Sequence, residues 1–322
     1  MGKFCFSTQD LKDIMDISKN RQHYVITGVS SPGKSARNSL VFFNRWDNEG
    51  NQAERYTECL VIVPSQSNPT SGLAQNNFVV FAEAPRKEYA IILDFILKKS
   101  RGKRQYTQLD NYIVVGENVK IGDNCDIEPF VFIDHDVTLG DHCIIKSGVR
   151  VSSFVEIGRS TTIRENTVVG GQGFGVERDG DGRTHKIPHL GGVVIGDFVE
   201  IGALNTIVSG TIDPTIIEDH VKTDDHVHVG HNCRIEKSVL ITACAEISGS
   251  VTVGAGSTIG PNASIMNKAT IGRNTTIGLG AVVTKSFPDG VTLAGSPADT
   301  IENVVAGRKA LKQLISENQD SN

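Results

Sequence analysis

Aromatic residues are scarce in this sequence. They make up 6 % of the 322 residues, with a single tryptophan, whereas hydrophobic residues reach 39 %. The apolar content must therefore come mostly from Val, Ile, Leu and Ala. Glycine is abundant by comparison, with 33 of 322 residues against a usual share of about 7 %. This composition favours short strands joined by tight turns.

The chain also lacks an excess of positive charge and any long apolar run. It has 32 Lys and Arg against 37 Asp and Glu, a formal net charge of -5. No overall positive field attracts a polyanion, which excludes nucleic acid as the expected partner. No run approaches the ~18 apolar residues of a transmembrane segment, and residues 1–17 mix Lys, Gln and Asp. We therefore expect a soluble, cytoplasmic protein.

Cysteine is sparse and has no metal-binding spacing. The six cysteines include no C-x-x-C pair, so neither a disulfide framework nor a zinc cage is predicted. We expect no bound metal.

A six-residue period dominates the sequence from Val115 onward. Aliphatic residues recur every six positions from Val115 to Val169, and again from Val229 to Val283, and a small residue commonly follows four positions after each. No amphipathic helix has this period, whereas a β-helix stacks one aliphatic side chain per hexad inside its coils. Cys125, Cys143 and Cys233 occupy the small position, so we interpret them as core residues.

The spacing predicts a mainly β protein with three parts. Residues 1–105 form a small α/β domain that ends in a basic linker at 98–104, residues 106–298 form the β-helix, and residues 299–322 form a C-terminal helix and tail. Within the first domain we expect strands at 24–29, 39–43, 59–63 and 78–81 and a helix at 86–99. The C-terminal helix, at 300–318, is expected to close the end of the solenoid, because an open coil would expose unpaired strand edges.

Two interruptions of the repeat are candidate functional segments. The first is the glycine-rich stretch 170–192, and the second is 209–215, where the hexad phase shifts. Each insertion must leave the stack of coils and lie at the surface. A flexible loop without function is the alternative interpretation of the first stretch.

A histidine string, TDDHVHVGHN at 223–232, follows the second interruption. Strand alternation predicts that His226 and His228 lie on the same face, with His231 beyond Gly230 on the next turn. Three histidines beside two aspartates are typical of a general base that a carboxylate or amide orients.

From about residue 24 to 268 the chain resembles the N-acyltransferases of lipid A synthesis, which acylate the 2-amino group of UDP-3-O-acylglucosamine. The repeat itself resembles the left-handed β-helix of hexapeptide-repeat acyltransferases, in which three hexads make one coil. The matching strings are VITGVSS (25–31), GFG (173–175), KIPHLG (186–191), VVIGDFVEIGA (193–203) and VGHN (229–232). The resemblance implies a homotrimer with active sites between adjacent solenoids, and a small domain that holds the uracil.

The resemblance also implies roles for individual residues. His231 matches the catalytic histidine, and we expect Asp225 to assist it. A backbone amide near Gly249 is a candidate donor to the oxyanion. The predicted substrate-binding residues are Phe43, Asn44, Trp46, Phe174, His189, His226 and His228.

The chain departs from the lipid A family at two places: a TIVSG string carries Val208 and Ser209 where the family has an acidic residue and Arg, and Lys268 replaces a histidine. Residues 278–301 instead resemble the terminal coil of CoA-dependent acetyltransferases, although Asp299 stands where those enzymes place a cation. This likeness predicts that the acyl-CoA co-substrate contacts Gly278, Ala281, Lys285, Ala294, Gly295 and Pro297.

The leading prediction is an N-acyltransferase without a permanent cofactor, which transfers an acyl group from acyl-CoA to a nucleotide-linked amino sugar. The alternative is the lipid A enzyme with a 3-hydroxyacyl carrier protein as donor. Two lesser alternatives remain. One is a carbonic anhydrase-like enzyme with zinc on His226, His231 and His189, and the other is a trimeric scaffold without catalysis.

Overall fold

The computed structural model describes residues 4–17, 20, 22–46, 53–67, 71–100, 105–109 and 112–319. The predicted linker at 98–104 is described as far as Ser100. The chain divides into two compact units. The first comprises residues 1–103 together with 174–190 and 211–213, and the second comprises residues 104–173, 191–210 and 214–322.

The first unit is built on a four-stranded parallel sheet. Its strands, in spatial order, are β3 (Gly28–Val29), β5 (Ser39–Phe42), β7 (Leu60–Pro64) and β8 (Phe78–Ala82). The helices are η1 (Thr8–Asp13), η2 (Ala53–Arg55), α1 (Ser71–Asn76) and α2 (Pro85–Ser100). Two short pairs complete it: β1 (Phe6–Ser7) with β2 (Val25–Ile26), and β4 (Ala36–Arg37) with β6 (Tyr56–Thr57).

Alternation along the strands gives this sheet two buried faces. In β7, Leu60 and Ile62 pack in one cluster with Ile92 and Leu93 of α2, whereas Val61 and Val63 pack on the opposite face. Both faces of a parallel sheet are normally covered in this way. The continuous apolar run in β7 follows from this double burial.

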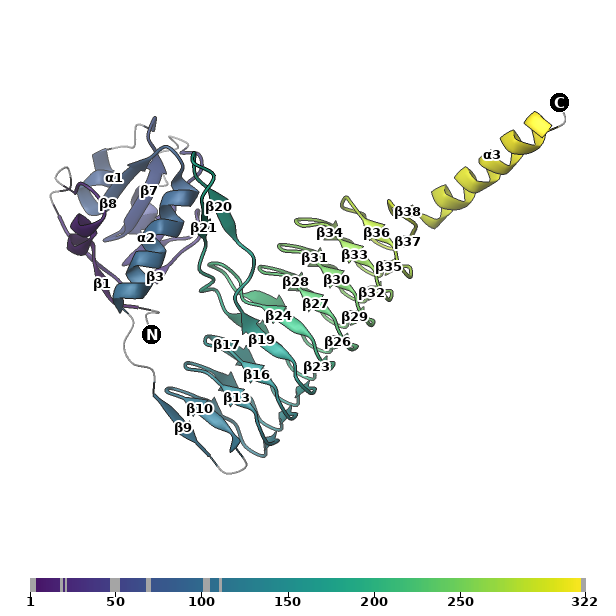
Figure 1. The fold of residues 1–322 in the computed structure, drawn as a ribbon, viewed down its shortest axis with the longest axis horizontal. Coiled ribbons are helices and arrows are strands. Elements are labelled where there is room, and N and C mark those ends of the chain that lie inside the picture. Colours follow the sequence, from purple (N-terminus) through teal and green to yellow (C-terminus); the bar gives the residue numbers. More distant parts are fainter. Residues whose placement is uncertain are drawn as a thin grey trace. The chain divides into compact units, whose positions relative to one another are not determined.

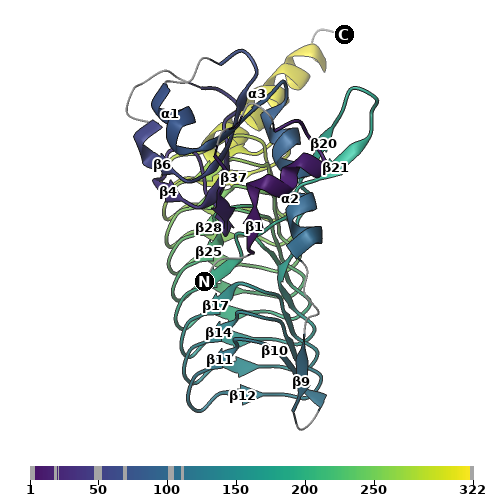
Figure 2. The same cartoon turned by 90° about the vertical axis from the view of Figure 1, so that its left-hand side faces the viewer.

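The first interruption of the repeat contributes to the first unit. Its residues form a hairpin of β20 (Val176–Arg178) and β21 (Thr184–Lys186), which lies beside α2 (Figure 2). Arg86 of α2 pairs with Glu177 at 2.6 Å, and Ile187 and Leu190 join the core on the α2 side of the sheet. The insertion is thus an ordered part of that unit, whereas a loop without a packed face was the alternative expectation.

The second unit is a parallel β-helix with three faces, and its coils are stacked in succession (Figure 1). The first face contains β9 (Tyr106–Gln108), β10 (Val114–Gly116), β13 (Phe132–Ile133), β16 (Arg150–Val151), β19 (Val168–Gly171), β24 (Thr206–Val208), β27 (His228–Val229), β30 (Glu246–Ile247), β33 (Ser264–Ile265) and β36 (Val282–Val283). The second face contains β11 (Lys120–Ile121), β14 (Thr138–Leu139), β17 (Val155–Ile157), β22 (Val193–Ile195), β25 (Thr215–Ile217), β28 (Arg234–Ile235), β31 (Thr252–Val253) and β34 (Thr270–Ile271). The third face contains β12 (Asp126–Ile127), β15 (Ile144–Ile145), β18 (Thr162–Ile163), β23 (Glu200–Ile201), β26 (Lys222–Thr223), β29 (Leu240–Ile241), β32 (Thr258–Ile259), β35 (Thr276–Ile277), β37 (Thr292–Ala294) and β38 (Asp299–Thr300).

The register confirms the predicted hexad repeat. Val115 pairs with Ile133, and Ile133 with Val151, so one coil takes three hexads. Ile133 and Val151 are fully buried in a single core that runs through the coils. β9 and β38, the terminal strands among the described residues of this unit, pair antiparallel with their neighbours.

We number the corners by the strands they connect: corner 1 joins the first face to the second, corner 2 the second to the third, and corner 3 the third to the first. One residue per corner commonly adopts a positive φ, for example Asn118, Asn124 and Asn166. Asparagine tolerates this left-handed conformation better than most residues. The glycines two positions earlier have another function. A Cβ at Gly230 would lie 2.6 Å from the Gly249 nitrogen of the next coil, so glycine there permits close stacking.

Two of the three cysteines at small positions are buried core residues, and the third, Cys125, is partly buried against the same core. Cys143 and Cys233 are buried, and their thiols donate hydrogen bonds to the carbonyls of Gly158 and Ser248. Burial raises the pKa of both thiols to about 11. A thiol with this pKa is a poor nucleophile at neutral pH.

The C-terminal helix α3 (Ile301–Gln319) matches the predicted position but does not close the solenoid by burying an apolar face. It contacts β37 and β38, yet Val305, Leu311 and Leu314 are 42 %, 58 % and 58 % exposed. The antiparallel β37–β38 pair covers the third-face edge instead. Across the described ranges, no helix combines the length and hydropathy needed to cross a membrane.

Candidate functional site

Corner 1 carries both interruptions of the repeat and the predicted base. The first insertion leaves the coil after β19 and returns before β22, and the second lies between β24 and β25. In the following coil the same corner contains Gly230, His231 and Asn232. Two consecutive coils are therefore interrupted at the corner that carries His231 in the next coil, which makes corner 1 the candidate site.

The two insertions are joined at their bases. Gly192 and Gly210 form an antiparallel bridge, with Gly210 N–H donating to the Gly192 carbonyl at 2.9 Å. The buried Ser209 hydroxyl donates to the Gly170 carbonyl at 2.7 Å. A Cβ at Gly192, which has φ +75°, would lie 1.9 Å from the Phe154 carbonyl oxygen. Ser209, a departure from the lipid A family, thus fastens the two loops together.

The His231 side chain is oriented by the residue that follows it. Its Nδ1 lies 3.0 Å from Asn232 Oδ1, and an amide oxygen only accepts hydrogen bonds, so Nδ1 carries the proton. Asn232 is held by its own N–H, which donates to Thr215 Oγ1 at 2.9 Å. This arrangement fixes the orientation of the imidazole ring.

Gly249 lies directly over this imidazole in the next coil. A Cβ at Gly249 would be 2.6 Å from His231 Nε2, so no larger residue fits without moving the ring. The Gly249 carbonyl accepts from Lys268 N–H at 3.0 Å. In the described part of the chain, no acceptor takes the Gly249 N–H. A backbone N–H and an imidazole are therefore adjacent at corner 1.

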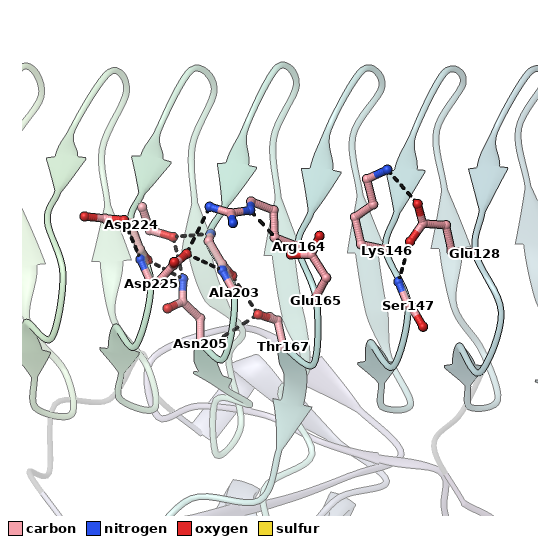
Figure 3. A network of polar contacts seen from close by, with 12 residues as sticks. Glu128, Lys146, Ser147, Arg164, Glu165, Thr167, Ala203, Asn205, Asp224 and Asp225 are labelled. Atoms are coloured by element: carbon pink, nitrogen blue, oxygen red, sulfur yellow. Dashed lines mark hydrogen bonds and ion pairs between the residues drawn. The ribbon is translucent and has the colours of Figure 1, made fainter.

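Asp225 lies at another corner and does not orient His231 within the chain. It belongs to corner 3, where its carboxylate accepts from Arg164 Nη1 at 3.0 Å and from Ala203 N–H at 2.8 Å (Figure 3). One face of the coil, with strand β27, separates it from His231. Asp225 and His231, which we expected to act together, are therefore not in contact within one chain, because six residues along a β-helix span a whole face. Asn232, which sequence reasoning missed, orients the imidazole instead.

A buried polar network lies beside Asp225 (Figure 3). The Asn205 amide donates to Thr223 Oγ1 at 2.6 Å and accepts from Val227 N–H, and Asn205 N–H donates to Thr167 Oγ1 at 3.0 Å. Asn205 is 1 % exposed and Thr167 is fully buried. Val227 lies between His226 and His228, so this network fixes the backbone of the histidine string.

We expect Asn205→Leu to destabilise the β-helix by about 2–4 kcal/mol, because it leaves Val227 N–H buried without its acceptor and removes one of the two donors to the Thr223 hydroxyl. Urea unfolding followed by circular dichroism measures this change. Asn262→Gly is the matched control, because Asn262 is an exposed corner residue whose positive φ glycine accepts. Equal stability of Asn205→Leu and the control would show that the network contributes little.

His226 and His228 are not on one face. His226 is an exposed corner 3 residue with φ 59°, because β27 begins only at His228 and alternation does not continue through a corner. His228 points outward on the first face, where its Nδ1 lies 3.1 Å from Thr206 Oγ1 and its Nε2 lies 3.9 Å from Glu246 Oε1. His226 and His231 therefore lie at different corners, which separates two ligands of the carbonic anhydrase alternative.

The residues predicted to bind the uracil base lie together in the first unit, but their two aromatic rings are not both exposed. Phe43 is 5 % exposed and packs edge-on against Trp46, with ring centres 4.9 Å apart. Asn44 is exposed. The Trp46 Nε1 atom is buried and has no hydrogen-bond partner among the described residues. Phe43 therefore supports the Trp46 ring from the core, and Trp46 is the more exposed of the two.

The insertion residues differ in exposure. Phe174 is 91 % exposed, whereas His189 is 2 % exposed and its Nδ1 lies 2.9 Å from the Ile187 carbonyl. The His189 ring requires glycine at position 175, where a Cβ would meet it at 3.0 Å. Within the described ranges, no group of three His, Cys, Asp or Glu residues could hold a metal ion.

The terminal-coil residues gather around β36 and β37. Gly295, with φ +94°, accepts from Val282 N–H at 3.0 Å, and the Ser296–Pro297 peptide bond that comes next is cis. A Cβ at Gly278 would lie 3.9 Å from Ala294, and Lys285 is exposed at corner 1. Ala281 is fully buried, and its N–H and carbonyl are both bonded within the coils. It is a core residue and cannot contact a ligand.

Comparison with known proteins agrees with the repeat and with the resemblance seen in the sequence. The family model described as Bacterial transferase hexapeptide (six repeats) matches residues 250–285. The chain is 42 % identical over 90 residues to UDP-3-O-acylglucosamine N-acyltransferase of Xanthomonas axonopodis pv. citri (strain 306), covering 28 % of this chain and 26 % of that protein. It is 46 % identical over 87 residues to UDP-3-O-acylglucosamine N-acyltransferase 2 of Legionella pneumophila (strain Lens), covering 27 % and 25 %. The match thus spans about a quarter of the length of these curated relatives.

Among solved structures, UDP-N-acetylglucosamine acyltransferase from Campylobacter jejuni matches with a TM-score of 0.53 and 24 % identity. The match covers 58 % of this chain and 71 % of that chain. At this identity the likeness concerns the fold alone. The second unit is a left-handed β-helix, as the resemblance to hexapeptide-repeat acyltransferases implies.

Proposed function

We propose that the chain is an N-acyltransferase that acylates the amino group of a UDP-3-O-acylglucosamine-type acceptor. The named relatives support this acceptor, which was the alternative in the sequence interpretation, over the broader class of nucleotide-linked amino sugars with acyl-CoA. One observation carries the proposal: the His231 imidazole, oriented by Asn232, lies against Gly249 of the next coil, just beyond the two coils from which the insertions emerge at the same corner. The reaction needs no permanently bound cofactor.

In the proposed mechanism the acceptor amine attacks the thioester carbonyl carbon directly. The C–N bond forms while the C–S bond breaks, and the amine proton passes to His231 Nε2 and then to the departing thiolate. The products are an amide and a free thiol. The Gly249 N–H donates to the carbonyl oxygen as negative charge develops there. No acyl-enzyme forms, because the nearby Cys233 thiol is buried and donates to Ser248.

We propose that the enzyme is a homotrimer. Experiment must distinguish between two acyl donors. Acyl-CoA and acyl carrier protein present the same thioester group. The predicted donor contacts at Gly278, Lys285, Ala294, Gly295 and Pro297 lie at the C-terminal coils, where either thioester arm could enter. Light scattering of the purified chain tests the trimer.

A thiol-release assay tests the function. The acceptors are UDP-3-O-acylglucosamine, UDP-glucosamine and a dTDP-linked amino sugar, and each is tested with acetyl-CoA, 3-hydroxybutyryl-CoA and 3-hydroxymyristoyl carrier protein. We expect the highest rate with UDP-3-O-acylglucosamine and the carrier protein, together with a new amide in the product's mass spectrum. A higher rate with acyl-CoA on an acceptor without the 3-O-acyl group would favour the broader class. Absence of thiol release from every pair would overturn the proposal and favour a scaffold.

A further inference from the structure

The loop between β3 and β4 has the composition of a phosphate-binding loop. Residues 28–35 read GVSSPGKS, which has the spacing G-x-x-x-x-G-K-S. Phosphate loops use this spacing because glycines admit the anion close to the backbone while lysine and serine contact its oxygens. Here β4 (Ala36–Arg37) follows the loop, whereas nucleotide-hydrolysing loops lead into a helix. The loop therefore offers the phosphate-binding groups without the hydrolase architecture.

In this structure the loop already holds an anion from the chain itself. The Lys34 ammonium donates to Asp213 Oδ1 at 2.6 Å, and the Ser31 hydroxyl donates to the other carboxylate oxygen. Asp213 comes from the second insertion, whose residues 211–213 belong to the first unit. The pair is solvent-accessible, with side-chain exposures of 64 % and 42 %. One ammonium and one hydroxyl on an oxyanion are the donors that a phosphate group uses.

The loop is connected to the aromatic cluster that contains Trp46. Gly33 N–H donates to the Tyr56 hydroxyl at 2.8 Å. The Tyr56 ring centre lies 5.5 Å from that of Phe43, and Phe43 lies 4.9 Å from Trp46. A nucleoside diphosphate has a planar base at one end and phosphates at the other. Trp46 matches the base and the Lys34 ammonium matches the phosphates, and the packed rings of Phe43 and Tyr56 connect the two.

Space beside the loop is open. A Cβ at Gly28 or Gly33 would meet nothing within 4 Å, and Gly33 has φ +87°. Arg55, whose Nη1 donates to the Gly33 carbonyl at 3.0 Å, adds a second cation to this edge. An oxyanion can therefore approach Ser31 and Lys34 without steric conflict from these two backbone positions.

We propose that the Ser31–Lys34 loop binds the diphosphate of the nucleotide-linked acceptor, and that the Asp213 carboxylate occupies this subsite when no ligand is bound. The identity of the ligand rests on the proposed function. Phosphate oxygens replace the carboxylate on the same two donors, and this exchange releases the second insertion from the loop. Acceptor binding is thereby coupled to the segment that precedes the histidine string.

Binding of uridine, UDP and inorganic pyrophosphate to the full chain tests this proposal by calorimetry, with fluorescence of the single Trp46 as a second readout. We expect Lys34→Ala and Ser31→Ala to raise the Kd of UDP about tenfold, the value of one charge-assisted hydrogen bond, and to leave the Kd of uridine unchanged. Lys34→Arg should restore part of the affinity. Asp213→Asn should lower the Kd of UDP several-fold, because it removes the competing anion. Lys12→Ala, an exposed lysine of η1, is the matched control.

The outcomes separate this proposal from the proposed function. If UDP binds the wild type and Lys34→Ala leaves its Kd unchanged, or weakens uridine equally, the diphosphate subsite is wrong and the function stands. If neither uridine nor UDP binds the wild type, the nucleotide-linked acceptor is wrong. In that case the binding of pyrophosphate tests the phosphate subsite by itself. Pyrophosphate binding to the wild type that is lost in Lys34→Ala would support the subsite, and absence of pyrophosphate binding would overturn it.

Discussion

Replacing His231 with alanine is expected to lower the rate of amide formation by about 10²- to 10⁴-fold, the usual contribution of a positioned general base. The side chain is partly exposed at a corner and is not part of the buried core, so the fold should survive. The measurement is thiol release under saturating acceptor, with circular dichroism as the check on folding.

Variants of neighbouring residues show whether this loss reflects the base itself. His226→Ala should retain most activity, because His226 is exposed at corner 3. Asp225→Asn should also act less strongly than His231→Ala, because the Asp225 carboxylate pairs with Arg164. Asn232→Gly keeps the positive φ and removes the amide that orients the imidazole, so an intermediate loss is expected. Full activity of His231→Ala would eliminate the proposed base.

The second large effect is expected from Gly249→Ala. The new methyl group would lie 2.6 Å from His231 Nε2, closer than nonbonded atoms allow, so the imidazole must turn away from the position that Asn232 gives it. We expect a loss of roughly a hundredfold, because both the base and its neighbouring backbone donor are disturbed. Gly249 does not have a positive φ, so stability should change little.

Gly307→Ala in α3 provides the control for this substitution, because a Cβ there meets nothing within 4 Å. It should leave activity unchanged. The Gly249→Ala variant should unfold at nearly the wild-type urea concentration while its activity falls. A parallel loss of stability and activity would mean that the methyl group distorts the coil, and would remove the support for a local effect on the imidazole.

Much of the fold could be predicted because the repeat is read directly from side-chain spacing. Residues such as Ile133 and Val151 must point inward in every coil, and their period fixes the faces. Short elements such as α1 and the β4–β6 pair escaped prediction, because two to six residues contain too few positions for a period. The C-terminal helix was correctly placed, but sequence spacing does not tell whether its apolar side finds a partner.

The candidate site was predictable only in part. His231 could be found because its string resembles a known family. Asp225 was a natural choice as its partner because it is near in sequence. In a β-helix, however, six residues lead from one corner to the next, so the two side chains lie at different corners. The contact between Asp213 and the Ser31–Lys34 loop joins positions about 180 residues apart. No local pattern reveals such a pair, since only the packing of the insertion brings it together.

Each regular coil contains 18 residues, so equivalent corner residues are spaced at equal intervals along the axis of the β-helix. Corner 1 repeats from His231 through Gly249 to Lys285, in register with the strand pairs from β27 to β36. Each coil adds one interstrand spacing of about 4.8 Å, so three coils place Lys285 roughly 14 Å along the axis from His231. Deleting or duplicating one coil between them would change this span in a single defined step while the chemistry at His231 stayed the same. In the proposed mechanism, the number of coils thus sets the length that a thioester arm must span between Lys285 and His231.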